Sequence, residues 1–275
     1  MLEARACMSV KDMTPWQFLK RQFRRGNSKD DGQKTVTRLV DLSFSLLQGG
    51  NYIEARGLLL RTLDYQSEIQ NPILLEWILT SLSRTWKETE EYQKWTEFFS
   101  DFIARNPNSA VAYNLRAESH WYGGNLHDAI ADYSRTLELD PNDAGAFLGR
   151  GQVFMESHDF THALKDLDLA LALMDSVPNA DSAWKADFEA FARNGRAAAY
   201  AGLGDLNRAM EEFDKSIALC PENAWVYFNR AQAYQNRGDR DNAVINYRLA
   251  IAKKRPKLTF TKRAHAKTQL STLTI

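Results

Sequence analysis

Apolar residues recur along most of the chain at spacings of three and four, the pattern of a helix with one buried face. Two stretches carry it in nearly the same form: "AAAYAGLGDLNRAMEEF" from Ala197 to Phe213, and "AQAYQNRGDRDNAVINY" from Ala231 to Tyr247, thirty-four residues further on. A Gly-Asp pair interrupts both, and glycine ends helices because it reaches positive φ at little cost. Each stretch therefore predicts a helix, a tight turn and a second helix.

The same arrangement can be traced over six segments, here called frames. They begin at Val36, Glu76, Ala110, Ala144, Ala190 and Ala224. The step from the fourth to the fifth frame is 46 residues instead of 34, which predicts an insert of about twelve residues over 178–189. A repeated hairpin cannot bury its apolar face alone, so the frames are expected to stack on one another.

Three positions of the frame are small almost everywhere: the eighth, the twentieth and the twenty-seventh. Small residues on facing sides let two helix axes come close, and the bulky residue at position twenty-four fills the space beside them. Trp95 and Phe102 depart from this rule in the second frame. Either the helices of that hairpin splay apart, or the hairpin has simply drifted from the pattern.

This pattern, with Pro107, Pro141 and Pro221 closing their frames, resembles the tetratricopeptide repeat. The resemblance implies an all-α, right-handed superhelical solenoid of about six helical hairpins with N- and C-terminal capping helices. The expected organisation is as follows: 1–35 a basic segment with a capping helix, 36–109 two divergent hairpins, 110–177 two repeats, 178–189 the insert, 190–257 two repeats, and 258–275 a basic capping helix.

The resemblance also implies that the first helix of each hairpin lines a concave groove. The residues expected there are Asn114, Glu118, Trp121, Gln152, Met155, Asn194, Phe228, Asn229, Gln232 and Gln235. Amide side chains both donate and accept hydrogen bonds, so they suit the backbone of an extended peptide, and aromatic or Met side chains suit apolar anchors. The alternative is a merely solvated groove.

Relatives that bind the acidic tails of chaperones use a clamp of Lys, Asn and Arg across three repeats. The equivalent positions here are Thr80, Arg84 and Leu115, a departure that argues against such tails as the partner.

An arginine stands at the seventh position of four frames: Arg116, Arg150, Arg196 and Arg230. Position twenty-three of the same frames is Asp, Asp, Glu and Asn. The arginines could form a basic ladder for an anionic ligand. We favour structural pairing with those side chains, because an arginine and a carboxylate match each other's geometry.

Formal net charge is zero, but Asp241 is the last acidic residue and the tail after it is basic. That tail could bind nucleic acid or another anionic surface, or it could only cap the array. At the other end, Trp16, Leu19 and Phe23 are spaced for a capping contact.

Little in the sequence suggests catalysis. His158 and His162 are four residues apart, as in some metal sites, but a structural or solvated role is favoured, and no metal or cofactor is expected. Two distant cysteines, Cys7 and Cys220, form no disulfide framework, and no apolar run reaches membrane-spanning length. We therefore expect a cytoplasmic, non-catalytic scaffold or adaptor that binds a protein or peptide segment in its groove; the alternative is a regulator that binds nucleic acid or an anionic surface through its basic tail.

Overall fold

The computed structural model describes residues 31–69, 71–175, 182–253 and 260–274. Every regular element in these ranges is helical, thirteen α-helices and one short 3-10 helix, so the all-α prediction is confirmed. The described residues form two compact units divided between Leu139 and Asp140. We call them the N-terminal unit and the C-terminal unit. The expected N-terminal capping helix, with Trp16, Leu19 and Phe23, lies outside the described residues.

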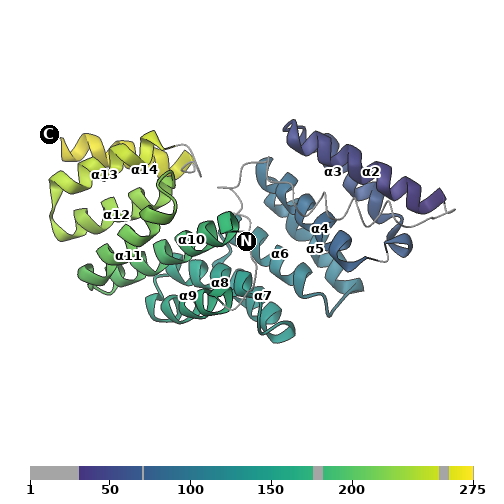
Figure 1. Cartoon of the computed structure of the whole chain (residues 1–275), viewed down its shortest axis with the longest axis horizontal. Helices are drawn as coiled ribbons and strands as arrows, with labels where there is room; N and C mark the ends of the chain where they lie inside the picture. The colour runs from purple at the N-terminus through teal and green to yellow at the C-terminus, as the bar shows by residue number, and fades with distance from the viewer. Residues whose placement is uncertain (1–30, 70, 176–181, 254–259, 275) are drawn as a thin grey trace. The chain divides into compact units, whose positions relative to one another are not determined.

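Helices pair into hairpins in chain order within each unit (Figure 1). The N-terminal unit holds α2 (Asp31–Gln48) with α3 (Tyr52–Leu63), α4 (Pro72–Glu88) with α5 (Tyr92–Arg105), and α6 (Ala110–Tyr122) with α7 (Leu126–Leu139). The C-terminal unit holds α8 (Ala144–Glu156) with α9 (Phe160–Asp175), α10 (Ser182–Gly202) with α11 (Leu206–Leu219), α12 (Ala224–Arg237) with α13 (Arg240–Ala252), and α14 (Phe260–Leu273), which packs on α13. A 3-10 turn, η2, spans Gln66–Glu68.

The small positions are the points where the two helices of a hairpin meet. At position twenty, Ala55, Ala129, Ala163, Ala209 and Ala243 are all fully buried, and so are the bulky residues at position twenty-four that pack beside them, such as Leu59, Leu167 and Phe213. Hydroxyl groups at position twenty-seven add a bond across the hairpin: the Ser216 hydroxyl donates to the Ala190 carbonyl at 2.7 Å. This close approach forms the core of each hairpin.

The second hairpin is built differently, as its two large residues predicted. Trp95 is fully buried and Phe102 nearly so, within a cluster where the Trp86 and Phe98 ring centroids are 5.0 Å apart. The α4 and α5 backbones approach each other at fewer points than the two helices of any other hairpin. Aromatic rings in place of methyl groups hold the two axes apart, which favours the splay over simple drift, the other alternative that the sequence left open.

An ion pair ties the first hairpin to the second. Arg56 of α3 reaches Glu91, the residue before α5, at 2.5 Å. Hydrogen bonds from Lys94, Thr89 and Arg56 lower the pKa of Glu91 to about 2, so this carboxylate stays ionised at neutral pH.

The inserted residues partly extend a helix. α10 begins at Ser182, eight residues before the fifth frame, so the last two thirds of the expected 178–189 insert belong to its first turns. Residues 176–181 are not described.

Each turn between paired helices has one residue of positive φ, always at position fifteen of its frame. Four are glycines, Gly50, Gly124, Gly204 and Gly238, with φ from 76° to 85°. The other two are Glu90 at 56° and His158 at 61°. A side chain strains this conformation because its Cβ approaches the following carbonyl oxygen. His158 is therefore a turn residue with a conformational cost.

We expect His158→Gly to stabilise the protein by about 1 kcal/mol, because glycine removes that strain. Chemical denaturation of the full chain measures the change. The matched control is Gly204→Ala, which introduces the same strain with no atom within 4 Å of the new Cβ, and should destabilise. A loss of stability in the His158 variant would contradict this account of the turn.

Two helical glycines should respond oppositely to alanine. A Cβ on Gly202 would lie 2.4 Å from the Phe160 ring, whereas one on Gly57 meets nothing within 4 Å. Alanine has the higher helix propensity, so Gly57→Ala should stabilise by up to about 1 kcal/mol. Gly202→Ala should cost about 1–3 kcal/mol through overpacking. Thermal unfolding of both variants tests this, and equal shifts of the same sign would refute it.

Candidate functional site

Three amide side chains predicted for the groove form a continuous row across α8, α10 and α12 of the C-terminal unit. Asn229 donates from Nδ2 to Oδ1 of Asn194 at 3.2 Å. Gln152 lies against the next residue of α10, because a Cβ on Gly195 would fall 2.5 Å from Gln152 Nε2. We call Gln152, Asn194 and Asn229 the amide row.

One donor of the amide row is unsatisfied. Gln152 Nε2 is buried and has no hydrogen-bond acceptor among the described residues. The Asn194 oxygen is used by Asn229, and Asn194 itself is 2% exposed. A buried amide hydrogen without an acceptor costs about 1–3 kcal/mol, so a turn of the half-buried Gln152 side chain toward an acceptor at the surface would be favourable.

Helix α14 contributes to the same region, and the sequence analysis did not place it there. Gln235 donates to Gln269 Oε1 at 2.7 Å and accepts from the Tyr247 hydroxyl at 2.7 Å. Gln269 follows Gln235 by thirty-four residues, so continuing the repeat register past the last hairpin would have found it. Lys262 lies 3.7 Å from the centre of the Trp225 ring and 3.9 Å from Glu156.

The remaining predicted residues of this unit differ in exposure. Phe228 is 4% exposed and packs between Tyr247 and His265, with ring centroids 5.9 and 5.7 Å away. Met155 and Gln232 are half-buried. Gln235 is half-buried as well, like Gln152 and Asn229 of the amide row, whereas Asn194 is buried like Phe228.

Asn114, Glu118 and Trp121 lie on α6 of the N-terminal unit. Asn114 and Glu118 are 8% and 5% exposed. Trp121 stacks on Tyr122, whose ring also stacks on Trp95. Lys87 lies 4.2 Å above the Tyr122 ring, which gives this cluster a cation–π contact of its own.

The arginines of position seven are structural, as favoured from the sequence. Arg116 binds Asp132 through two nitrogens, both at 2.7 Å, and Arg150 binds Asp166 at 2.7 and 3.0 Å. The hydrogen bonds to Asp132 raise the pKa of Arg116 above its usual value. Such bidentate pairs leave these guanidinium groups largely occupied, so they do not form a ladder for an anionic ligand.

The other two arginines make contacts between neighbouring hairpins. Arg230 donates from Nε to Asn246 at 2.8 Å and pairs with Asp214 of the preceding hairpin at 2.7 Å. Arg196 pairs with Asp168 of the preceding hairpin at 3.1 Å, while Arg193 reaches Glu212 at 3.2 Å. Position seven thus links each of these hairpins to the one before it.

Other side chains considered for chemistry have structural surroundings. His162 binds Asp159 at 2.7 Å, and Cys220 is buried at the end of α11. In the described part of the chain, no group of three His, Cys, Asp or Glu side chains is placed to hold a metal ion. None of the described helices is long and apolar enough to cross a membrane.

Three family models match the chain, all within residues 114–252. Two are described as tetratricopeptide repeat and match residues 114–183 and 226–252; a third, TPR repeat, matches 197–238.

Curated relatives are similar over short segments. Tetratricopeptide repeat protein 36 of Bos taurus is 44% identical over 52 residues, 19% of this chain and 28% of that protein. Hsp70-Hsp90 organizing protein 3 of Arabidopsis thaliana is 32% identical over 72 residues, which are 26% of this chain and 13% of that protein. A Protein SGT1 homolog of Oryza sativa is 29% identical over 80 residues, which are 29% of this chain and 22% of that protein. The matched segments span less than a third of the length of each relative.

Solved structures show the same fold at low identity. A chain of the APC/C hetero-tetramer Cut9-Hcn1 matches with a TM-score of 0.70 at 14% identity, over 96% of this chain and 46% of that one. TTC0263, a thermophilic TPR protein of Thermus thermophilus, matches with a TM-score of 0.54 at 22% identity, over 73% of this chain and 99% of that one. The type IV pilus biogenesis factor PilW matches with a TM-score of 0.56 at 17% identity, over 72% of this chain and 90% of that one.

The Arg150–Asp166 pair makes a stability prediction. Arg150→Gln should lower the free energy of unfolding by about 3 kcal/mol, because Asp166 is 3% exposed and would be left as a buried charge without its partner. Arg263→Gln on the exposed surface of α14 is the control and should change it by less than about 0.5 kcal/mol. Denaturant titration compares the two, and equal losses would show that the buried pair has no special role.

Proposed function

Because this chain is a tetratricopeptide-repeat protein, we propose that it is a non-catalytic scaffold or adaptor that binds an extended segment of a protein partner. The binding site is the amide row of the C-terminal unit. The observation that carries the proposal is Gln152 Nε2, a buried donor without an acceptor beside two further amides.

The chemistry of the amide row fits a peptide backbone. Gln152 Nε2 supplies a donor, and Asn194 and Asn229 retain hydrogen-bonding groups that their mutual bond does not use. Once the half-buried Gln152 side chain turns toward the groove, a partner's carbonyl oxygen would satisfy its donor and remove the cost of leaving it unpaired. Neutral amides bind the partner's backbone by hydrogen bonds and make no ion pairs, so binding should depend little on salt concentration. Half-buried Met155 and Gln232 would contact the partner's side chains.

The partner's identity does not follow from the relatives. One of them is named as an Hsp70-Hsp90 organizing protein, but the likeness spans 13% of that protein. Thr80, Arg84 and Leu115 stand where chaperone-binding repeats are expected to carry their clamp. We therefore propose a partner recognised through its backbone. A reduced, cytoplasmic setting belongs to this proposal, since two cysteines far apart in the sequence form no disulfide framework.

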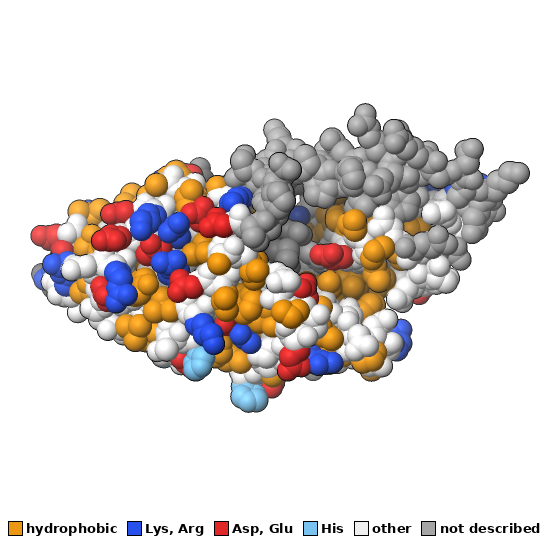
Figure 2. Space-filling model, turned by 60° about the horizontal axis from the view of Figure 1, so that its bottom comes forward, with side chains coloured by type: hydrophobic (Ala, Val, Ile, Leu, Met, Phe, Trp, Pro, Cys, Tyr) orange, Lys and Arg blue, Asp and Glu red, His pale blue; other side chains and the backbone are white. Residues whose placement is uncertain are grey.

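A second candidate is an anionic partner at the C-terminal end. Helix α14 has no acidic residue, and Arg263 and Lys267 are exposed one turn apart on it. On the face that Figure 2 shows, Lys and Arg side chains are interspersed with Asp and Glu. Mixed charge weakens the field that an anionic polymer would feel, so this candidate ranks second.

Substitution at Gln152 separates binding from stability. Gln152→Met keeps the side-chain volume and removes the unsatisfied donor, so it should raise the unfolding free energy by about 1 kcal/mol. The same change should weaken binding about tenfold. The probes are peptides selected from a random twelve-residue display library on the intact protein, with affinities measured by calorimetry and unfolding by denaturant.

Asn194→Ala/Asn229→Ala should weaken the same peptides at least as much, and exposed Asn142→Ala is the matched control. If the selected peptides bind all variants equally, the amide row is not the binding site. Binding that falls steeply with salt and is lost in Arg263→Glu/Lys267→Glu would favour the anionic partner instead.

A further inference from the structure

At two junctions, the first residue of a second helix packs against the end of the next hairpin's first helix. In the C-terminal unit, Phe160 begins α9 and its ring lies against the backbone of Gly202 at the end of α10. In the N-terminal unit, Tyr92 begins α5 and stacks on Tyr122 at the end of α6, with centroids 6.0 Å apart. An aromatic ring therefore closes both junctions at the edge where the turns lie.

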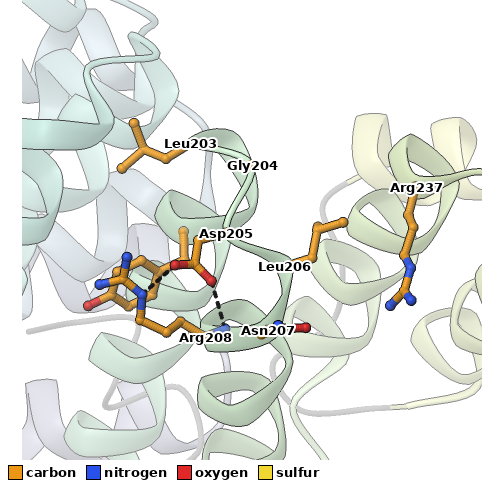
Figure 3. A pocket seen from close by; sticks show the side chains of 8 residues that line it. Leu203, Gly204, Asp205, Leu206, Asn207, Arg208 and Arg237 are labelled. Carbon is orange, nitrogen blue, oxygen red and sulfur yellow. Dashed lines mark hydrogen bonds and ion pairs between the residues drawn. The ribbon is translucent and has the colours of Figure 1, made fainter.

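The junction between α11 and α12 lacks such a ring. Its residue is Leu206, which begins α11, and Arg237 ends the facing helix α12. A pocket of about 610 Å³ opens there, within the roughly 300–1,000 Å³ usual for binding pockets. Figure 3 shows Leu206 and Arg237 extending toward the same space from opposite sides. We call this the junction pocket; it is lined by Tyr200, Leu203, Gly204, Asp205, Leu206, Asn207, Arg208 and Arg237.

Only one charge of the junction pocket is free for a partner. Arg208 pairs with Asp205 at 2.5 Å and its guanidinium lies 4.6 Å from the centre of the Tyr200 ring (Figure 3). Asp205 also caps α11 by accepting from the Arg208 amide at 3.1 Å. Arg237 has no ion pair in the described part of the chain. The nearby Asp239, whose pKa it helps to lower, is engaged with Asn242.

The rim of the junction pocket is apolar where other turns are not. Leu203, at position fourteen of its frame, is 53% exposed. The corresponding residues of the other frames are Gly49, Thr89, Gly123, Ser157 and Arg237. A single exposed leucine is common on protein surfaces, but Leu203 lines the same pocket as Leu206, so the two side chains together give it an apolar edge.

We propose that the junction pocket is a second protein-binding site, outside the amide row, that takes one aromatic side chain of a partner segment with an acidic residue next to it. The aromatic ring fills, from outside, the space that Phe160 fills at the preceding junction. The adjacent carboxylate pairs with Arg237, and Leu203 and Leu206 contact the ring. The junction pocket and the amide row would then hold two partner segments at once.

The test fills the junction pocket from within. Leu206→Phe introduces the residue found at the preceding junction, so the protein should fold with equal or higher thermal stability while the pocket closes. The probe is an acetylated, amidated pentapeptide with one phenylalanine between two pairs of glutamates, titrated to millimolar concentration and followed by the methyl NMR signals of Leu203 and Leu206. Wild type should show saturable shifts.

Leu206→Phe, Leu203→Ser and Arg237→Ala should each weaken binding about tenfold or more, followed by intrinsic fluorescence or calorimetry where the methyl signal is lost. Ile245→Ala, on an equally exposed residue of α13, is the matched control and should bind like wild type, as should the Asn194→Ala/Asn229→Ala variant. The absence of saturable shifts, equal binding by Leu206→Phe, or equal binding of a peptide with lysines in place of the glutamates would each overturn the proposal.

Discussion

The close approach of two helix axes at buried small residues is the constraint on which every hairpin depends. The helix axes lie so close at position twenty that only a small residue such as alanine fits there. A bulky residue such as Phe213 then fills the remaining space beside it. The exception shows the rule: Trp95 and Phe102 occupy two of these contacts in the second hairpin, and α4 and α5 meet over a shorter stretch. Packing volume sets the spacing of the helices.

Polar contacts then link neighbouring hairpins. Arg196 and Arg230 each reach an aspartate of the hairpin before them, and Arg56 reaches Glu91 of the hairpin after it. The two aspartates are exposed, so these pairs add little to stability beside the packing of the interfaces. The turn residues contribute in a different way, because positive φ at one fixed position reverses the chain in all six hairpins at the same point.

Both proposed sites lie at positions that the repeat leaves variable. Gly195 lacks the Cβ that would collide with Gln152, and this space admits a buried amide that no group among the described residues satisfies. Leu206 is smaller than the Phe160 ring that closes the preceding junction, and a pocket remains. In a repeat protein, the recurring positions are explained by packing, so the variable positions are the informative ones.

The sequence by itself determined the helical hairpins, because the small positions, the Gly-polar turns and the 34-residue period are local and recur: α6, α8 and α12 begin at the predicted residues 110, 144 and 224. It also indicated the Arg–carboxylate pairs, whose sixteen-residue spacing repeats. Only the tertiary structure decided that Phe228 is a core residue and that Gln152, Asn194 and Asn229 form one row. It alone placed α14 beside Gln235 and left a pocket at Leu206. Burial, hydrogen bonding and unfilled volume depend on which helices become neighbours, and no periodicity along one chain specifies these distances.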